Sequence, residues 1–254
     1  MKSPIKNRLH VNNTAAALRE IMPPGSVIGT PAFFDGKVEF SLAQNDRFVK
    51  AHTSSKPVYE FWKCMSHDSR RVCDLATCED FVFDDEQMFT TLQEMWHKHN
   101  SAFVKSALFF LLNSYSDTGL ISCGQLKKEF FNPIAVANLR RFKMPETFCI
   151  MHEVKDIPQL IDESNIEDYN LIIGGKFSYN LFEHGKSRGP EETRINHRQI
   201  IKFMQRTNKR VAVTYDYDRK AVAAAKKLNK IFVDKYGRIT NNEPQAQEVI
   251  VANF

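Results

Sequence analysis

Three cysteines and a histidine that could bind a metal lie close together in the first third of the chain. Cys64, His67, Cys73 and Cys78 follow one another as C-x2-H-x5-C-x4-C. Structural zinc sites pair their ligands at spacings such as C-x2–4-C and H-x3–5-H, and this order contains no paired C-x2-C. The chain has five cysteines, an odd number, and its N-terminal segment shows no export signal, so reduced thiols are expected. We therefore expect no metal site here and assign these thiols to the core or to an inert surface.

Two further groups carry chemistry-bearing side chains without the partners that catalysis needs. Asp216 and Asp218 flank Tyr217, but no third oxygen ligand stands nearby to complete a cation site. His152 precedes Glu153, and no Ser or Cys can be placed beside them as a nucleophile. The first pair is interpreted as a cap at a strand end, and a hydrolase triad is not supported.

Basic residues interleaved with phenylalanines form the candidate nucleic-acid contact. The residues are Lys127, Lys128, Arg140, Arg141 and Lys143, with Phe130, Phe131 and Phe142 among them. Cations can neutralise phosphates while aromatic rings stack on bases. The competing interpretation is a solvated surface over a small aromatic core. This pattern is compatible with a nucleic-acid partner. The family resemblance described below implies that this partner is double-stranded DNA, and other protein subunits are the alternative.

Composition permits this function without requiring it. The formal charge of +5 is a mild excess that many proteins without a nucleic-acid partner also carry. No apolar run reaches the ~20 residues that span a bilayer, so no membrane partner is expected. The segment MKSPIKNRLH has charge but no apolar core like that of a signal peptide. The expected location is the cytoplasm or the interior of a virion.

Strands and helices are expected to alternate in the C-terminal half, and these elements would position the candidate residues there. Expected strands are 148–154, 170–173, 210–215, 230–234 and 248–252, and expected helices are 157–163, 196–207 and 218–228. This alternation predicts an α/β fold with a mostly parallel sheet covered by helices on both faces. The last strands are the ones that could pair antiparallel.

The N-terminal half is predicted to be mainly helical. Helices are expected at 12–21, 56–64, 84–99 and 101–113, and extended segments at 26–28 and around 37–42. From 114 to 145 periodicity fades and turn formers alternate with basic residues, which is typical of an irregular or small independent subdomain.

The order of several short segments resembles a known enzyme family. The segments are PVYEFW (Pro57–Trp62), LNSYSDTGLIS (Leu112–Ser122), KKEFFNP (Lys127–Pro133), VAVTYDYD (Val211–Asp218) and QEVIVANF (Gln247–Phe254). Their order and spacing are similar to those of the Dam-like DNA N6-adenine methyltransferases. The resemblance implies a Rossmann-like methyltransferase core over 1–65 and 146–254. It also implies an inserted, mainly helical or irregular target-recognition-like subdomain over 66–145.

The positions that would bind the methyl donor in this family carry other residues here. Where the family has G-x-K, the chain has Asn12-Asn13-Thr14. Where the first strand ends in F-x-G-x-G, so that backbone can approach the ligand, it has Thr30-Pro31-Ala32-Phe33. Where the second strand ends in an acidic residue for the ribose, it has Thr53. The comparison implies that S-adenosylmethionine does not bind and that no other cofactor is needed.

The family's catalytic motif D-P-P-Y is also changed. Its counterpart is Gly174-Gly175-Lys176-Phe177, in which only the aromatic could still stack on a flipped adenine. We expect this degenerate loop to keep the backbone geometry of the motif without its chemistry, with the Lys176 ammonium reaching solvent or a carboxylate. The expected function is that of a pseudoenzyme without catalytic residues that binds DNA or partner proteins, as a structural or regulatory subunit of a viral or mobile-element assembly. An active but divergent methyltransferase and a purely structural protein remain the alternatives.

Overall fold

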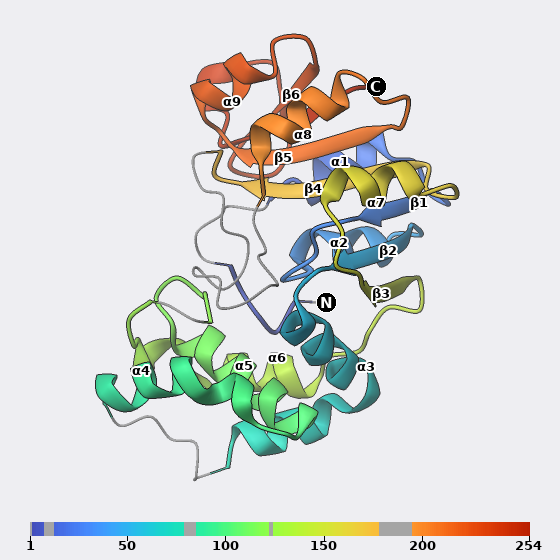
Figure 1. Cartoon of the computed structure of the whole chain (residues 1–254). Coiled ribbons are helices and arrows are strands. Elements are labelled where there is room, and N and C mark those ends of the chain that lie inside the picture. Colours follow the sequence, from blue (N-terminus) through green and yellow to red (C-terminus); the bar gives the residue numbers. More distant parts are fainter. Residues whose placement is uncertain (1, 8–12, 79–84, 122–123, 178–194) are drawn as a thin grey trace. The chain divides into compact units, whose positions relative to one another are not determined.

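The computed structural model describes residues 2–7, 13–78, 85–121, 124–177 and 195–254 (Figure 1). These residues form two compact units. One contains 13–54, 145–177 and 195–254, and the other contains 2–7 and 55–144. The expected insertion begins at 66, whereas the helical unit begins at 55, because helix α3 (Lys56–Ala76) groups with it along its whole length.

The α/β unit contains an eight-stranded sheet. Its strands are β1 (Val27–Thr30), β2 (Phe48–Thr53), β3 (Phe148–His152), β4 (Tyr169–Gly175), β5 (Val211–Asp216), β6 (Asn229–Val233), β7 (Ile239–Thr240) and β8 (Glu248–Ala252). They lie in the order β3-β2-β1-β4-β5-β8-β6-β7. The first five strands pair in parallel, and β8 is antiparallel to both β5 and β6. The fold is therefore α/β with a mostly parallel sheet, as the alternation of elements predicts, and is consistent with a Rossmann-like arrangement.

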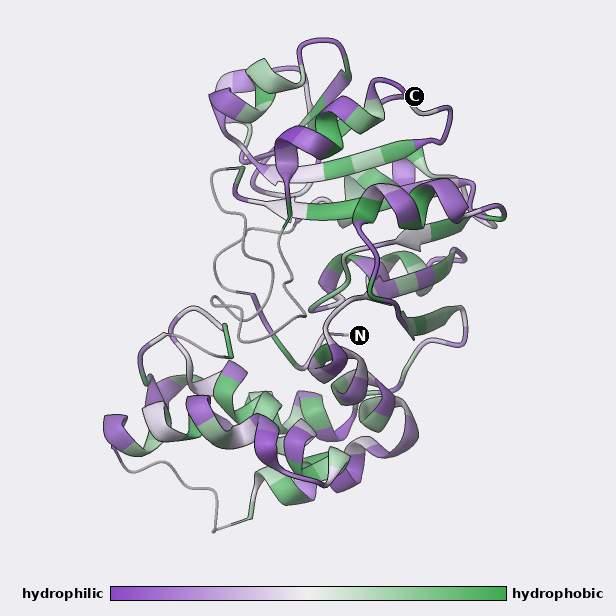
Figure 2. Cartoon of the chain, viewed as in Figure 1, coloured by the Kyte–Doolittle hydropathy of each residue, from purple (hydrophilic) through white to green (hydrophobic). Residues whose placement is uncertain are grey.

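Short helices connect these strands. They are α1 (Ala15–Ile21), α2 (Lys37–Ala43), α7 (Ile157–Glu163), α8 (His197–Met204), α9 (Arg219–Ala224) and the 3-10 turn η4 (Glu243–Gln245). The chain crosses from β1 to β2 in one direction and from β4 to β5 in the other. Right-handed crossovers therefore place α2 on one face of the sheet and α7, α8 and α9 on the opposite face (Figure 1). The central strands β4 and β5 are largely apolar because both their faces are covered (Figure 2).

The expected extended segment around 37–42 is wrong, because these residues form helix α2. Val38, Phe40 and Leu42 alternate with polar residues, which is a pattern typical of a strand. Glu39, which should then have faced solvent, is instead buried with them. Gly36 starts the helix with φ +69, and a Cβ there would lie 2.3 Å from the Phe40 ring. Only glycine fits this conformation and this close approach without strain.

The helical unit packs around α3 and α5 (Ala102–Tyr115). Its other elements are α4 (Glu86–Met95), η2 (Trp96–Lys98), η3 (Lys128–Phe130) and α6 (Pro133–Arg140). Phe61 of α3 stacks on Phe109 of α5 with ring centroids 4.8 Å apart, and Trp96 meets the same ring at 5.7 Å. The segment 114–145, expected to be irregular, contains α6, whose first turn is capped by the Asn132 side chain.

Candidate functional site

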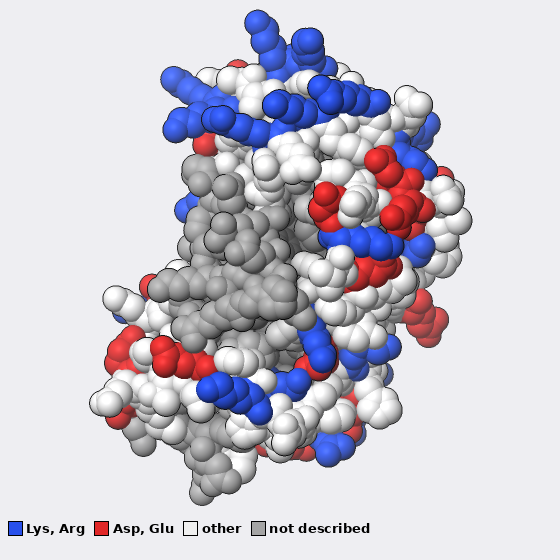
Figure 3. All heavy atoms as spheres, viewed as in Figure 1, with Lys and Arg blue, Asp and Glu red and all other residues white. Residues whose placement is uncertain are grey.

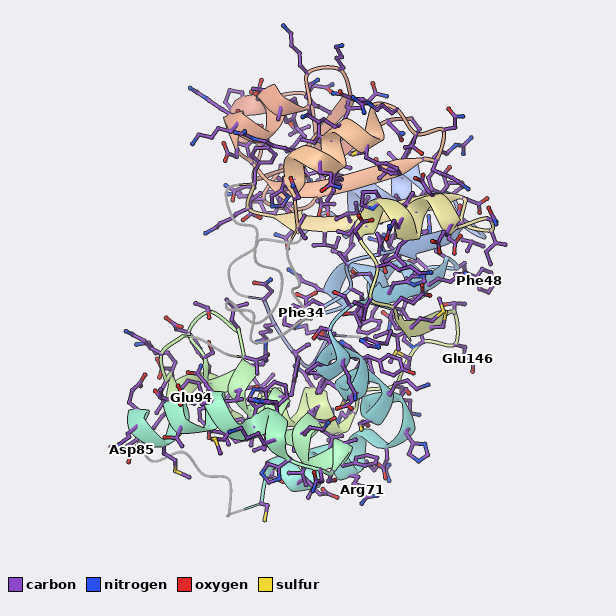
Figure 4. All side chains as sticks on the ribbon, viewed as in Figure 1. Phe34, Phe48, Arg71, Asp85, Glu94 and Glu146 are labelled. Carbon is purple, nitrogen blue, oxygen red and sulfur yellow. The ribbon has the colours of Figure 1, made fainter. Side chains whose placement is uncertain are left out.

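The carboxyl ends of the parallel strands are where ligands bind in open α/β sheets, beside the point where the strand order reverses. In this sheet that point lies between β1 and β4. The segments that surround it are the loop after β1, the end of β2, and the degenerate loop after β4. Figure 4 labels Phe34 near this edge, and Phe48 at the opposite edge, where β2 begins.

The loop after β1 is part of the core. Every residue from 30 to 36 is buried. The backbone N–H of Phe33 donates to the carbonyl of His52 at 2.9 Å, which fastens the loop to β2. The Phe33 ring packs against Phe40 at 5.9 Å and Phe148 at 5.2 Å. Phe33, in the turn that the resemblance aligns with a glycine-rich strand end, is thus part of a buried aromatic cluster.

A buried carboxyl group lies just beyond this loop, and sequence reasoning missed it. Glu39 is 2% exposed, and its Oε2 has no hydrogen-bond partner among the residues that the structure describes. Burial, with a smaller contribution from the nearby Asp35 carboxylate, raises the pKa of Glu39 to about 8. Glu39 is therefore mostly protonated at neutral pH.

The end of β2 presents a histidine beside a glutamate. His52 Nδ1 lies 3.4 Å from Glu153 Oε1, although the two atoms do not meet in hydrogen-bond geometry. Burial lowers the pKa of His52, and the Glu153 carboxylate partly opposes that effect. Thr53, the residue expected at the ribose position, is buried, and its carbonyl accepts from Glu153 N at 3.2 Å. The strand end is thus tied to Glu153 rather than carrying an acidic residue of its own.

The degenerate loop ends β4 beside an aromatic cluster. Gly174 faces the Tyr215 ring so closely that a Cβ would lie 2.6 Å from Cε1. The ring of Phe177 lies 5.5 Å from Tyr215 and 5.6 Å from His197. The Tyr215 hydroxyl is buried and finds no hydrogen-bond partner in the described part of the chain, and burial raises its pKa well above the usual value. Phe177 therefore packs on the protein's own rings.

The backbone of this loop differs from the expectation. Gly175 has φ +61, and the pairing of β4 with β5 shifts register between Ile173 and Gly175. Proline is locked near φ −65, so the D-P-P-Y motif could not adopt this turn at its second position. The expectation that the loop keeps the motif's backbone geometry is therefore wrong. Lys176 is exposed, which leaves its ammonium in solvent.

The basic residues of the helical unit lie around α6 and η3. All five (Lys127, Lys128, Arg140, Arg141 and Lys143) are exposed. Arg140 pairs with Asp74 at 2.7 Å. Together with Arg141 it lines an open groove of about 540 Å3 whose other walls are Phe131, Asn132, Pro133, Val136 and Ala137.

Two of the three interleaved phenylalanines pack against other aromatic rings of the helical unit. Phe131 stacks on Tyr115 with centroids 4.8 Å apart, and the buried Phe142 packs on Trp62 at 5.4 Å. These rings are committed to internal contacts. The alternative of a solvated basic surface over a small aromatic core therefore describes them better than a base-stacking platform does.

The cysteine and histidine group shows no metal geometry. Cys64 and Cys73 are buried, Cys78 is exposed, and Cys73 Sγ lies 3.8 Å from the Val136 carbonyl oxygen. Over residues 2–7, 13–78, 85–121, 124–177 and 195–254, no three His, Cys, Asp or Glu side chains are arranged to hold a metal ion. No helix within those ranges is long and apolar enough to cross a membrane.

No known protein-family model matches the sequence, and no curated protein shows significant similarity to it.

Proposed function

We propose that the chain is a non-catalytic protein with a DNA adenine methyltransferase-like fold that acts by binding nucleic acid. The strand order β3-β2-β1-β4-β5 supports the fold part of this proposal, since it creates a switch point at β1 and β4. The sequence resemblance supports its link to DNA. The non-catalytic part of the proposal rests on the chemistry at the carboxyl edge of the sheet.

The observation that carries the proposal is that side chains at this edge are used for internal packing. The loop after β1 buries Phe33 beneath α2, and β4 places Gly174, its last residue but one, against Tyr215. A carboxylate at residue 174 would meet that ring. Methyl transfer to adenine needs an acceptor for the amino group, and Gly174 offers none.

Binding of S-adenosylmethionine tests the catalytic half. Calorimetry should show no saturable heat up to millimolar donor, and donor should not raise the thermal midpoint of unfolding. Incubation with labelled donor and DNA should transfer no label. A micromolar dissociation constant, or any transfer, would contradict the proposal in favour of a divergent active enzyme.

Binding of duplex DNA tests the other half. Fluorescence anisotropy with a labelled duplex of about 20 base pairs should show affinity that falls as salt rises, because phosphate contacts release counterions. Absence of binding at low salt would remove the nucleic-acid function.

Binding of a protein partner is a second candidate, favoured by one surface feature. Ile134 on α6 is 71% exposed and follows Pro133, which lines the groove of the helical unit. One exposed apolar side chain is ordinary on a protein surface, but a contiguous apolar patch made by Ile134 with the apolar walls of this groove would be typical of a protein contact. Co-purification of a defined second chain that is lost in an Ile134→Glu variant would support this candidate.

A further inference from the structure

The positive charge of the chain is concentrated at its C-terminal end. Residues 195–254 contain 12 Lys and Arg against 5 Asp and Glu, a net charge of +7. The rest of the chain, residues 1–194, contains 23 basic and 25 acidic residues. The mild overall excess of +5 therefore conceals one strongly basic segment.

The fold gathers these cations on one part of the α/β unit. Arg198, Lys202 and Arg206 recur at intervals of four along and just beyond α8, opposite buried residues such as Ile200 and Ile201. Helix α9 lies on the same face of the sheet as α8. Figure 3 shows Lys and Arg side chains gathered over α8, α9 and the turn between β6 and β7. We call this surface the basic face; its exposed cations are Arg198, Lys202, Arg206, Arg210, Arg219, Lys220, Lys226, Lys227, Lys235 and Arg238.

Four of the five acidic residues of this segment accept hydrogen bonds from groups other than the exposed cationic side chains. Asp218 caps α9 by accepting from Lys220 N at 2.7 Å, and buried Glu248 accepts from Asn13 N at 2.7 Å. Glu243 accepts from the Tyr217 hydroxyl at 2.9 Å. Within the described ranges, none of the ten exposed cations forms an ion pair with a carboxylate. Arg140 in the helical unit, by contrast, already has Asp74.

The turn between β6 and β7 adds one aromatic ring to this surface. Tyr236 is 69% exposed, with Lys235 Nζ 5.0 Å and Arg238 Cζ 5.8 Å from its ring centroid. Asp234 Oδ1 fixes the turn by accepting from the backbone N–H groups of Tyr236 and Arg238 at 2.8 and 2.9 Å. The turn therefore holds two cations and a ring outward in a defined conformation.

We propose that the basic face binds the phosphate backbone of a nucleic-acid duplex and supplies the larger share of the chain's affinity for it. This inference rests on the proposed nucleic-acid function and names its surface. Cations without carboxylate partners, spread over several elements, suit the regularly spaced phosphates of a duplex. A single-strand site would need several stacking rings, and Tyr236 is the only exposed large aromatic residue recorded in the described part of this segment.

Two variants with the same charge change test the assignment. The face variant carries Arg198→Gln, Lys202→Gln, Lys220→Gln and Lys227→Gln. The control variant carries Lys127→Gln, Lys128→Gln, Arg141→Gln and Lys143→Gln in the helical unit. Each lowers the formal charge from +5 to +1 and changes only exposed side chains. Circular dichroism and thermal unfolding establish that both variants are folded before binding is measured.

Duplex affinity is measured by anisotropy between about 50 and 200 mM salt for wild type and both variants, with DNA and RNA duplexes. The face variant should lose at least about tenfold in affinity at about 100 mM salt, and its log–log salt slope should flatten by about 1 for each lost phosphate contact. The control variant should stay within about threefold of wild type. A preference for one duplex identifies which nucleic acid the face serves.

The other outcomes overturn the inference in distinguishable ways. A larger or equal loss in the control variant would assign the contact to the helical unit. Wild-type binding that neither variant changes would place the contact elsewhere and leave the proposed function standing. Stronger binding to single strands or to anionic vesicles than to duplexes would show that the duplex is not the partner of the basic face. Failure of wild type to bind any nucleic acid would end the proposed function itself.

Discussion

The Tyr215 ring of β5 occupies the space into which any side chain at position 174 of β4 would extend. A Cβ there would lie 2.6 Å from Tyr215 Cε1 and 3.0 Å from the carbonyl oxygen of Thr214. The two strands pair in parallel, and their register shifts at this point. Glycine at the end of β4 is therefore explained by packing against β5.

This relationship predicts a stability effect that depends on both residues. Gly174→Ala should destabilise the chain by about 1–3 kcal/mol, because overpacking forces neighbouring groups to move. The loss is measured from urea unfolding followed by circular dichroism. Combining it with Tyr215→Val should make Gly174→Ala much less harmful, whereas Tyr215→Phe should not. Equal effects of Gly174→Ala in all three backgrounds would show that Tyr215 is not the obstacle.

Glu39 predicts an unusual dependence of stability on pH. Its pKa is raised from 4.5 to about 8 in the folded chain, so the folded state holds a proton that the unfolded state releases. Its contribution to stability is complete below pH 4.5 and is lost as pH rises through about 8. Glu39→Gln keeps the size and hydrogen-bonding character but cannot ionise. It should therefore remove this decline and be more stable than wild type at alkaline pH.

The measurement is the free energy of unfolding between about pH 5 and 9, with each unit of pKa shift worth about 1.4 kcal/mol. The exposed Glu20→Gln is the matched control and should keep the wild-type pH dependence. Parallel curves for wild type and Glu39→Gln would show that Glu39 is ionised in the folded chain.

The aromatic core of the helical unit can be tested with its own optical signal. Both tryptophans, Trp62 and Trp96, are buried in this unit, so their fluorescence reports on it alone. Phe109→Ala removes a ring that contacts Phe61 and Trp96, and should cost about 3–5 kcal/mol. Met88→Ala, at a side chain that is 43% exposed, should leave the fluorescence transition nearly unchanged. A similar midpoint for both variants would contradict the assigned core.

The sequence predicts elements best where local signals agree. The helix Ile157–Glu163 and the strand Glu248–Ala252 have the predicted bounds. The alternating pattern of helix α2 is typical of a strand, whereas its burial on both sides, including that of Glu39, depends on neighbours distant in the chain. Helix α6 was missed although Asn132 and Pro133 are ordinary helix-start signals.

The candidate site shows the same division between local and tertiary information. An irregularity at the end of β4 could be predicted from Gly174 and Gly175, since glycine inside a strand often marks a bulge, and the register against β5 shifts between Ile173 and Gly175. The contact with Tyr215 could not, because it depends on the register between two strands separated by a long connection. The net charge of residues 195–254 is a signal of the basic face that the sequence already carries. Its shape is not, because only the fold places α8, α9 and the β6–β7 turn together.

Restoring the catalytic motif is the most direct test of lost activity. The four-residue variant carries Gly174→Asp, Gly175→Pro, Lys176→Pro and Phe177→Tyr. It should transfer no methyl group to DNA, because the loop after β1 remains filled by Phe33 and the second strand lacks its acidic residue. Proline cannot adopt the φ of +61 at position 175, and a carboxylate side chain at position 174 would meet Tyr215, so misfolding is a second route to loss of activity in this variant.

A second variant, Gly174→Asp with Tyr215→Ala, keeps Gly175 and makes room for the carboxylate. Circular dichroism shows whether each variant is folded, and labelled donor measures transfer. Methyl transfer by either folded variant would show that the donor site is intact and that only the residues of the catalytic motif are missing.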